Sequence, residues 1–229
     1  MKYLYCIGIA IISLCIVLPV YAADLGVGIS AWYPDWEMDN SSNQKKTFDP
    51  VLCIGPSLSY QFSETLSATL VALFTPKKYE MPEEESEDSE LRRYDSDLAL
   101  NYQLNRYIKL FAGAKYLGFT FEGGKHHGAG PGAGIGFTIP IVYNFYFLGN
   151  ASGLYLYGNH SDNEHDTNYN EYGYNLAGQL AYYFVSIGLT TSLGYRYQYI
   201  KSNYNTNDMA DDEHTFKGFT CLVVKSFHL

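Results

Sequence analysis

The sequence has 229 residues, with 15 Lys or Arg against 24 Asp or Glu, and a formal net charge of −9 at pH 7. An acidic chain repels the phosphates of nucleic acid, so the composition argues against a nucleic-acid partner. The length is that of a single domain.

The first 22 residues predict a cleaved signal peptide. Lys2 supplies a positive charge, residues 7–18 form an apolar run too short for a membrane helix, and Val20-Tyr21-Ala22 resembles a small-residue cleavage site. Cleavage after residue 22 also removes Lys2. The remaining residues 23–229 are expected to form one domain, with 24 acidic and 14 basic residues. The mature chain is therefore expected to be exported.

Export and cysteine number together exclude one class of fold. Only Cys53 and Cys221 remain after removal of the signal peptide. Small secreted domains that depend on disulfides carry more cysteines. We predict that these two stay unpaired thiols.

The mature chain opens with alternating segments. Residues 25–33 predict a first strand, which Pro34 is expected to end, and residues 51–61 predict a second strand. Pro56 lies inside the second segment, and because proline lacks a ladder donor it predicts a bulge there. Residues 66–74 follow a tight reversal as the third strand.

An acidic segment separates the third and fourth strands. Residues 80–90 contain seven acidic side chains in eleven positions, a run that cannot be buried. It predicts an exposed loop over residues 75–92. Two further strands are expected at 93–104 and 107–117, joined by a tight turn.

The middle of the chain is rich in glycine. Within the strand predicted at 129–139, glycine occupies every second position from 130 to 136, and no phosphate-binding motif matches these residues. We interpret them as a thin wall that lets neighbouring side chains cross an interior. The next segment, 146–157, predicts a less regular strand, since Leu154 and Leu156 share a face with Asn150, and a bulge is expected there.

The hairpin from Tyr172 to Ile200 has the clearest alternation. Bulky residues fall on every second position on both sides of a reversal at Val185-Ser186, and Gly, Ser, Thr, Ala and Asn dominate the opposite face. Each arm has about a dozen residues, and a tilted strand needs roughly 9–11 to cross a bilayer. Tyrosines gather at both ends, as in interfacial girdles. We predict that the bulky face meets lipid and the small face lines a lumen.

The whole pattern predicts ten strands, the last at 215–229. The fold class is all-β: a closed antiparallel transmembrane β-barrel with short periplasmic turns and long extracellular loops. The long loops are expected at residues 34–50, 75–92, 119–128, 160–171 and 201–214.

These features resemble the small outer-membrane β-barrel proteins of bacteria, including OmpA-like, opacity-like and omptin barrels. The resemblance covers nearly all of the mature chain and indicates no particular subfamily. It implies a location in the cell outer membrane, contact with outer-membrane lipid and lipopolysaccharide, and recognition by the barrel-assembly machinery. In such proteins the last residue is usually aromatic, whereas here Phe227 precedes a final Leu229.

Five charged residues are expected to line the lumen. They alternate with bulky residues on their predicted strands, and inside a barrel a charge persists only when it is paired or hydrated. Two interpretations remain open: a salt-bridge lattice that ties the wall together, or a pore lining that sets ion preference. The residues are Asp95, Asp97, Lys109, Lys115 and Arg196.

Histidines concentrate in the last three predicted loops, beside acidic residues. Imidazoles and carboxylates from neighbouring loops are a possible divalent-metal site, although no spacing matches a zinc signature. The alternative is that these are ordinary residues of solvated loops, and no metal or other cofactor is predicted. The histidines are His126, His127, His160, His165 and His214.

Two short motifs contain residues that could serve in catalysis. Asp95-Ser96-Asp97 and Asp212-Glu213-His214 are predicted at the outer ends of their strands, and omptin proteases use acidic residues and histidine to activate water. The surrounding sequence does not match that family. No enzyme is therefore predicted, and an omptin-like protease is kept as the second alternative.

The leading functional prediction is a narrow porin-like channel, for small polar solutes, or a structural barrel. The first alternative is a surface adhesin whose acidic extracellular loops bind an extracellular ligand. A conductance measurement separates a channel from both alternatives.

Overall fold

A computed structural model describes residues 24–40, 45–77, 79, 91–121, 124–161, 166–204 and 211–228. The predicted signal peptide lies outside these residues. Within the described residues, no helix is long and apolar enough to cross a membrane. The helical segment present there is a single turn, η1 (Val185–Ile187).

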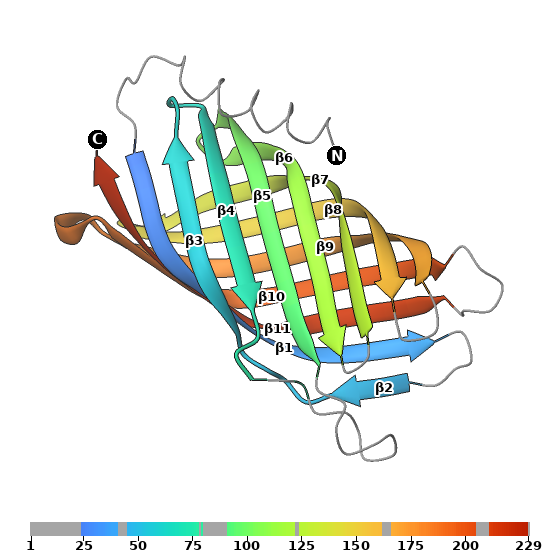
Figure 1. The fold of residues 1–229 in the computed structure, drawn as a ribbon. Coiled ribbons are helices and arrows are strands. Elements are labelled where there is room, and N and C mark those ends of the chain that lie inside the picture. Colours follow the sequence, from blue (N-terminus) through green and yellow to red (C-terminus); the bar gives the residue numbers. More distant parts are fainter. Residues whose placement is uncertain are drawn as a thin grey trace.

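The chain forms a closed antiparallel β-barrel (Figure 1). β1 pairs with β11 from Asp24 opposite His228 to Asn40 opposite Asp212, which closes the wall. β2 and β3 pair with the same edge of β1, at its outer and inner halves, so eleven strands fill ten positions. The strands are β1 (Asp24–Asn40), β2 (Lys45–Phe48), β3 (Cys53–Gln61), β4 (Leu66–Phe74), β5 (Arg92–Asn105), β6 (Ile108–Phe121), β7 (Gly124–Val142), β8 (Phe145–Ser161), β9 (Asp166–Phe184), β10 (Leu189–Tyr204) and β11 (Asp212–His228).

The exterior carries the bulky face of each strand. Ile29, Leu100 and Leu193 are 58%, 56% and 62% exposed, and large apolar residues are exposed on every strand of the barrel except the short β2. A water-soluble barrel would not expose this much apolar surface, whereas a barrel surrounded by lipid requires it. The predicted transmembrane barrel of ten strands, with bulky residues outward, is confirmed.

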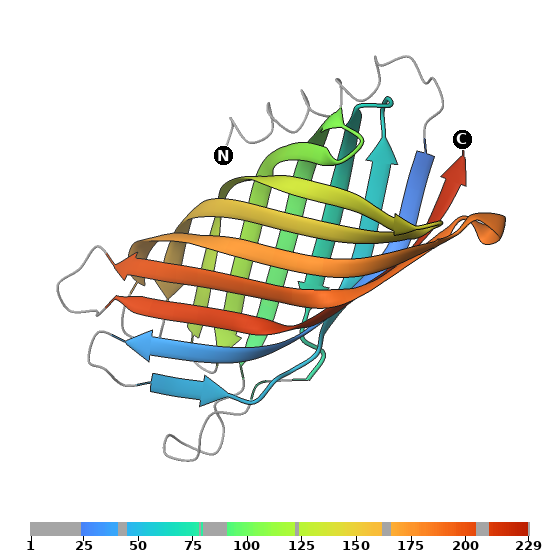
Figure 2. The same cartoon turned by 180° about the vertical axis from the view of Figure 1, so that it is seen from behind.

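Both ends of the described chain lie at the end of the barrel that carries the short turns (Figures 1 and 2). The predicted turn positions are correct for β3–β4, β5–β6, β7–β8 and β9–β10. At the opposite, outer end the strands continue further than predicted. β7 and β9 have 19 residues each, about twice the number that crosses a bilayer.

Much of the sequence predicted as outer loop is therefore strand. β6 runs to Phe121 and β7 begins at Gly124, within the expected loop at 119–128. β9 and β11 likewise begin inside the loops expected at 160–171 and 201–214. These segments are polar and were therefore predicted as loops. A strand that projects beyond the membrane does not need an apolar outer face, so polar residues are compatible with strand there.

The prediction that Pro34 ends the first strand is wrong. β1 continues through Pro34, which lies opposite Gly218 of β11. On the opposite edge of β1, Trp32 pairs with Cys53 of β3 and Trp36 pairs with Phe48 of β2. Residues 33–35 of β1 have no pairing partner on that edge. Proline is tolerated because one ladder is already interrupted at this point.

Neither predicted bulge is present. β3 and β4 keep one register across Pro56, from Ile54 opposite Phe74 to Ser57 opposite Val71. β8 likewise keeps one register with β9 along its whole length. Leu154 and Leu156 share the inward face with Asn150 because they belong to a cluster of buried apolar side chains in the lumen.

Candidate functional site: the barrel lumen

The inward-facing residues change character along the barrel axis. On β1 the sequence of inward residues runs from Ser30 to Trp36, and on β6 from Gly113 through Lys115 to Phe119. Inward positions recur at every second residue, so the register of the strands aligns them into layers. The layers are a polar inner half, a charged middle and an aromatic outer end.

A charged cluster forms the middle layer around Asp95, which is 2% exposed. Its carboxylate accepts hydrogen bonds from Lys115 at 2.7 Å, Arg93 at 2.8 Å and Arg196 at 3.5 Å. Lys115 also donates to Asp97 at 3.0 Å, and the Arg196 guanidinium lies 3.7 Å from the same carboxylate. These five residues are the charged cluster, and they join β5, β6 and β10.

Aromatic rings pack against the guanidinium groups of the two arginines. The Arg93 guanidinium lies 3.6 Å from the centre of the Phe216 ring, and that of Arg196 lies 4.2 Å from the centre of the Trp32 ring. Arg93 also donates to Gln198 at 2.7 Å. Desolvated cation–π contacts of this kind contribute about 2 kcal/mol each. The cluster is therefore fixed by rings as well as by carboxylates.

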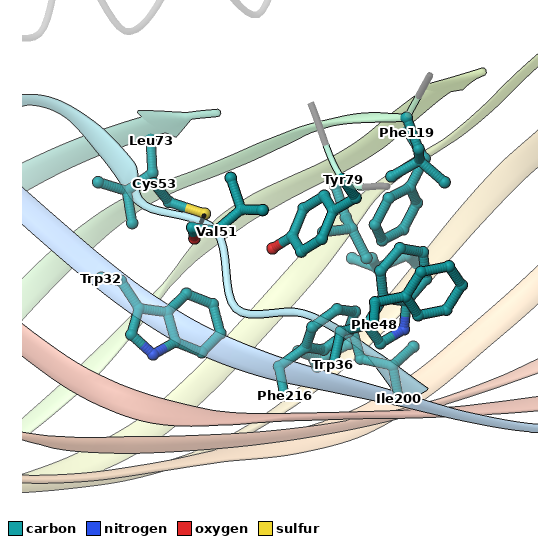
Figure 3. Close-up of a cluster of buried hydrophobic side chains, with 14 residues drawn as sticks. Trp32, Trp36, Phe48, Val51, Cys53, Leu73, Tyr79, Phe119, Ile200 and Phe216 are labelled. Carbon is teal, nitrogen blue, oxygen red and sulfur yellow. Dashed lines mark hydrogen bonds between the residues drawn. The ribbon is translucent and has the colours of Figure 1, made fainter. Parts of the chain in front are cut away.

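An aromatic plug fills the lumen outside the charged cluster (Figure 3). Trp36 stacks on Phe48 with ring centres 4.1 Å apart, and on Phe119 and Phe216 at 5.2 Å and 5.4 Å. Tyr79 meets the Trp36 ring edge-on at 5.4 Å. We call these five residues the aromatic plug, because together with buried Leu117, Leu156 and Ile200 they pack the outer lumen with apolar side chains, beside the buried polar residues His126, Glu171 and His214.

The inner half of the lumen holds a cavity of about 240 Å³, which we call the lumen chamber. Most strands of the wall contribute to its lining. Amide and hydroxyl side chains line it together with apolar residues, which include Phe111, Leu154 and Leu222. The polar and charged lining residues are Ser30, Thr69, Asp97, Asn101, Lys109, Lys115, Asn150, Ser152, Asn175, Gln179, Arg196 and Thr220.

The glycines of β7 make room for inward side chains of the neighbouring strand β6. A side chain at Gly134 would begin 2.6 Å from Phe111, and one at Gly136 would begin 2.5 Å from Lys109. Both distances are shorter than any tolerated contact. This agrees with the interpretation of the glycine-rich segment as a thin wall.

The five lumen charges predicted from the sequence all face inward. Asp95, Asp97, Lys115 and Arg196 come together in the charged cluster, and the proximity of Asp95 and Asp97 to Lys115 follows from the pairing of β5 with β6. Lys109 lies apart from them in the lumen chamber. Arg93 was missed, although its alternation with outward Tyr94 was visible in the sequence.

Four of the five predicted histidines, His126, His127, His160 and His214, lie on strands and not in loops. His126 Nε2 is 3.0 Å from Glu171 Oε1, and the imidazole stacks on Tyr169 with ring centres 4.1 Å apart. His160 lies 5.7 Å from His126 between ring centres, and His214 Nδ1 accepts a hydrogen bond from Trp36 at 3.3 Å.

The other two predicted histidines do not join this group. His127 is exposed on the outer face, and His165 lies outside the described residues. Among the described residues, no three His, Cys, Asp or Glu side chains are arranged to hold a metal. Glu171, which also accepts from Ser202 at 2.8 Å, was expected in a loop, yet it continues the inward alternation of the hairpin.

The two motifs considered for protease chemistry are occupied by other contacts. Asp95 and Asp97 bind cations in the charged cluster, while Asp212 accepts from the Tyr204 hydroxyl at 3.3 Å. His214 packs against Phe216, with ring centres 6.2 Å apart.

No protein-family model matches this sequence, and neither does any curated protein. Solved structures with a similar fold include Neisserial surface protein A (13% identity, TM-score 0.43, covering 90% of this chain and 99% of that chain). OprG from Pseudomonas aeruginosa (13%, 0.40, 91% and 96%) and the P. putida toluene transporter TodX (11%, 0.34, 92% and 91%) are also similar. At these scores the similarities carry no argument about function.

Proposed function

We propose that the protein is an outer-membrane β-barrel that conducts small polar solutes through its lumen, with the aromatic plug as a closed gate. The lumen chamber supports this proposal. A barrel of about eight to ten strands can be filled with packed side chains, and apolar packing is often as stable as buried ion pairs or more so. A cavity with polar and charged lining residues, beside a buried charged cluster, is thus better explained by solute passage than by stability.

The composition of the plug supports a gate. Trp36, Phe119 and Phe216 belong to long strands of the wall, whereas Phe48 ends the four-residue β2 and Tyr79 is held by an isolated bridge to Leu91. Displacement of the last two residues would loosen the plug without breaking the barrel. Figure 3 shows both rings reaching inward from these connecting segments.

We expect the double variant Trp36→Ala/Phe48→Ala to conduct several-fold more current than the wild type in planar lipid bilayers, because it removes the stacked pair at the centre of the plug. The control is Tyr182→Ala/Phe184→Ala, which removes a ring pair 4.6 Å apart on the lipid-facing side. Equal conductance of both variants, with insertion verified, would contradict the channel and favour a structural barrel.

A further inference from the structure

We infer that the lumen chamber is a binding site for a small carboxylate anion and that Lys109 is its principal ligand. This inference deepens the proposed function by naming the class of solute. It rests on that function only for the route by which the anion enters and leaves.

Lys109 differs from the other lumen cations in having no counter-ion. Arg93, Lys115 and Arg196 each contact a carboxylate, whereas no described acidic residue lies within ion-pair distance of the Lys109 ammonium. Its side chain lies along the wall over Gly136 of the neighbouring β7, toward Asn150 of β8. The Lys109 side chain is half-buried, so its unpaired ammonium is partly desolvated, and an anion in the chamber would compensate this cost.

The charge balance of the lumen favours an anion as well. The charged cluster holds three cations, Arg93, Lys115 and Arg196, and two anions, Asp95 and Asp97, so its formal charge is 3 − 2 = +1. Lys109 raises the total for the cluster and the chamber to +2. The surplus faces the chamber, because its lining includes Lys109, Lys115 and Arg196.

Neutral hydrogen-bond donors surround the same space. Asn175 accepts from Arg196 and Gln179 accepts from Ser192 through their side-chain oxygens. Their NH2 groups have no acceptor among the described residues and line the chamber. Amide donors together with an ammonium form a suitable shell for carboxylate oxygens.

The apolar part of the lining distinguishes a carboxylate from an inorganic anion. Phe111, Leu154 and Leu222 contribute surface that a short alkyl group can contact. A cavity of about 240 Å³ has room for a few carbon atoms beyond the carboxylate. We therefore choose propionate as the probe, and phosphate and chloride as the comparison anions.

The experiment is calorimetric titration of sodium propionate into the protein in zwitterionic detergent. We expect wild-type binding, at least a tenfold loss in Lys109→Met, and retention in Lys109→Arg. The matched control is Lys125→Met, which removes one positive charge from an exposed position on β7. The plug variant Trp36→Ala/Phe48→Ala is titrated in parallel, so that a closed lumen cannot conceal the site.

Three results would overturn the inference. They are absence of propionate binding in both wild type and plug variant, equal binding by Lys109→Met, and binding of phosphate or chloride as tight as that of propionate. Thermal unfolding with and without propionate shows whether Lys109→Met is folded, since the wild type alone should gain stability from the ligand.

The proposed channel and the proposed anion site can be rejected independently of each other. Propionate binding without conductance in any variant would leave the site and reject the channel. Conductance with unchanged binding in Lys109→Met would reject the site and leave the channel. In a conducting plug variant, we expect the reversal potential under a salt gradient to shift toward cation preference when Lys109→Glu is added.

Discussion

Asp95→Asn is expected to destabilise the barrel by about 3–5 kcal/mol, because it leaves buried cations without their shared carboxylate. Asp95 is the only residue that contacts Arg93, Lys115 and Arg196 together in the described chain. Asparagine keeps the size of the side chain and one acceptor oxygen. The loss is therefore one of charge and not of packing.

The measurement is urea unfolding in lipid vesicles, followed by the fluorescence of Trp32 and Trp36, which both lie in the lumen. Asp97→Asn is the matched control on the same strand. The Asp97 side chain is 40% exposed, so water screens its pairs with Lys115 and Arg196 and its loss should cost much less. Equal losses in the two variants would show that Asp95 has no special place in the cluster.

The architecture of the wall could be predicted from the sequence because each transmembrane stretch obeys a strict period of two. The hairpin at residues 172–200 and the inner turns were correctly placed. Lipid requires an apolar outer face along each strand, and the alternation that produces this face stops abruptly at each short turn. Beyond the membrane this requirement ends. The outer ends of β6 to β11 were consequently predicted as loops.

The lumen was predictable residue by residue but not as a site. Alternation was enough to place Asp95, Lys109 and Lys115 inside, and pairing of consecutive strands brought Asp95 near Lys115. The contacts of Arg196 depend on closure of the barrel, which brings β10 across the lumen from β5. No local pattern contains that information.

The aromatic plug could not be predicted for a similar reason. Phe48 and Tyr79 come from segments whose sequence shows little alternation. Their rings contact Trp36 of β1, which is distant from Tyr79 in the sequence. Pro34 obscured the continuation of β1 that carries Trp36. Tertiary packing overrides the local signal at this point.

Leu193→Arg is expected to cost about 2–4 kcal/mol, because it places a charge at the bilayer midplane on the lipid-facing side. Leu193 is 62% exposed and lies opposite Leu180 of β9, five residues into β10 from the inner turn. The control is Val185→Arg, at a residue that is 60% exposed within η1 at the inner turn. Near the interface an arginine reaches water, so its cost should fall to about 0–1 kcal/mol.

The native thiols provide an independent measure of the same surface. Cys221 is exposed on β11 opposite Leu193, whereas Cys53 is buried, and both are free. A fluorophore on Cys221 should be quenched by quenchers attached to lipid chains and shielded from water-soluble ones. Quenching by iodide instead, together with equal costs for the two arginine variants, would mean that the bulky face meets water. The transmembrane barrel, and with it the proposed channel, would then be rejected.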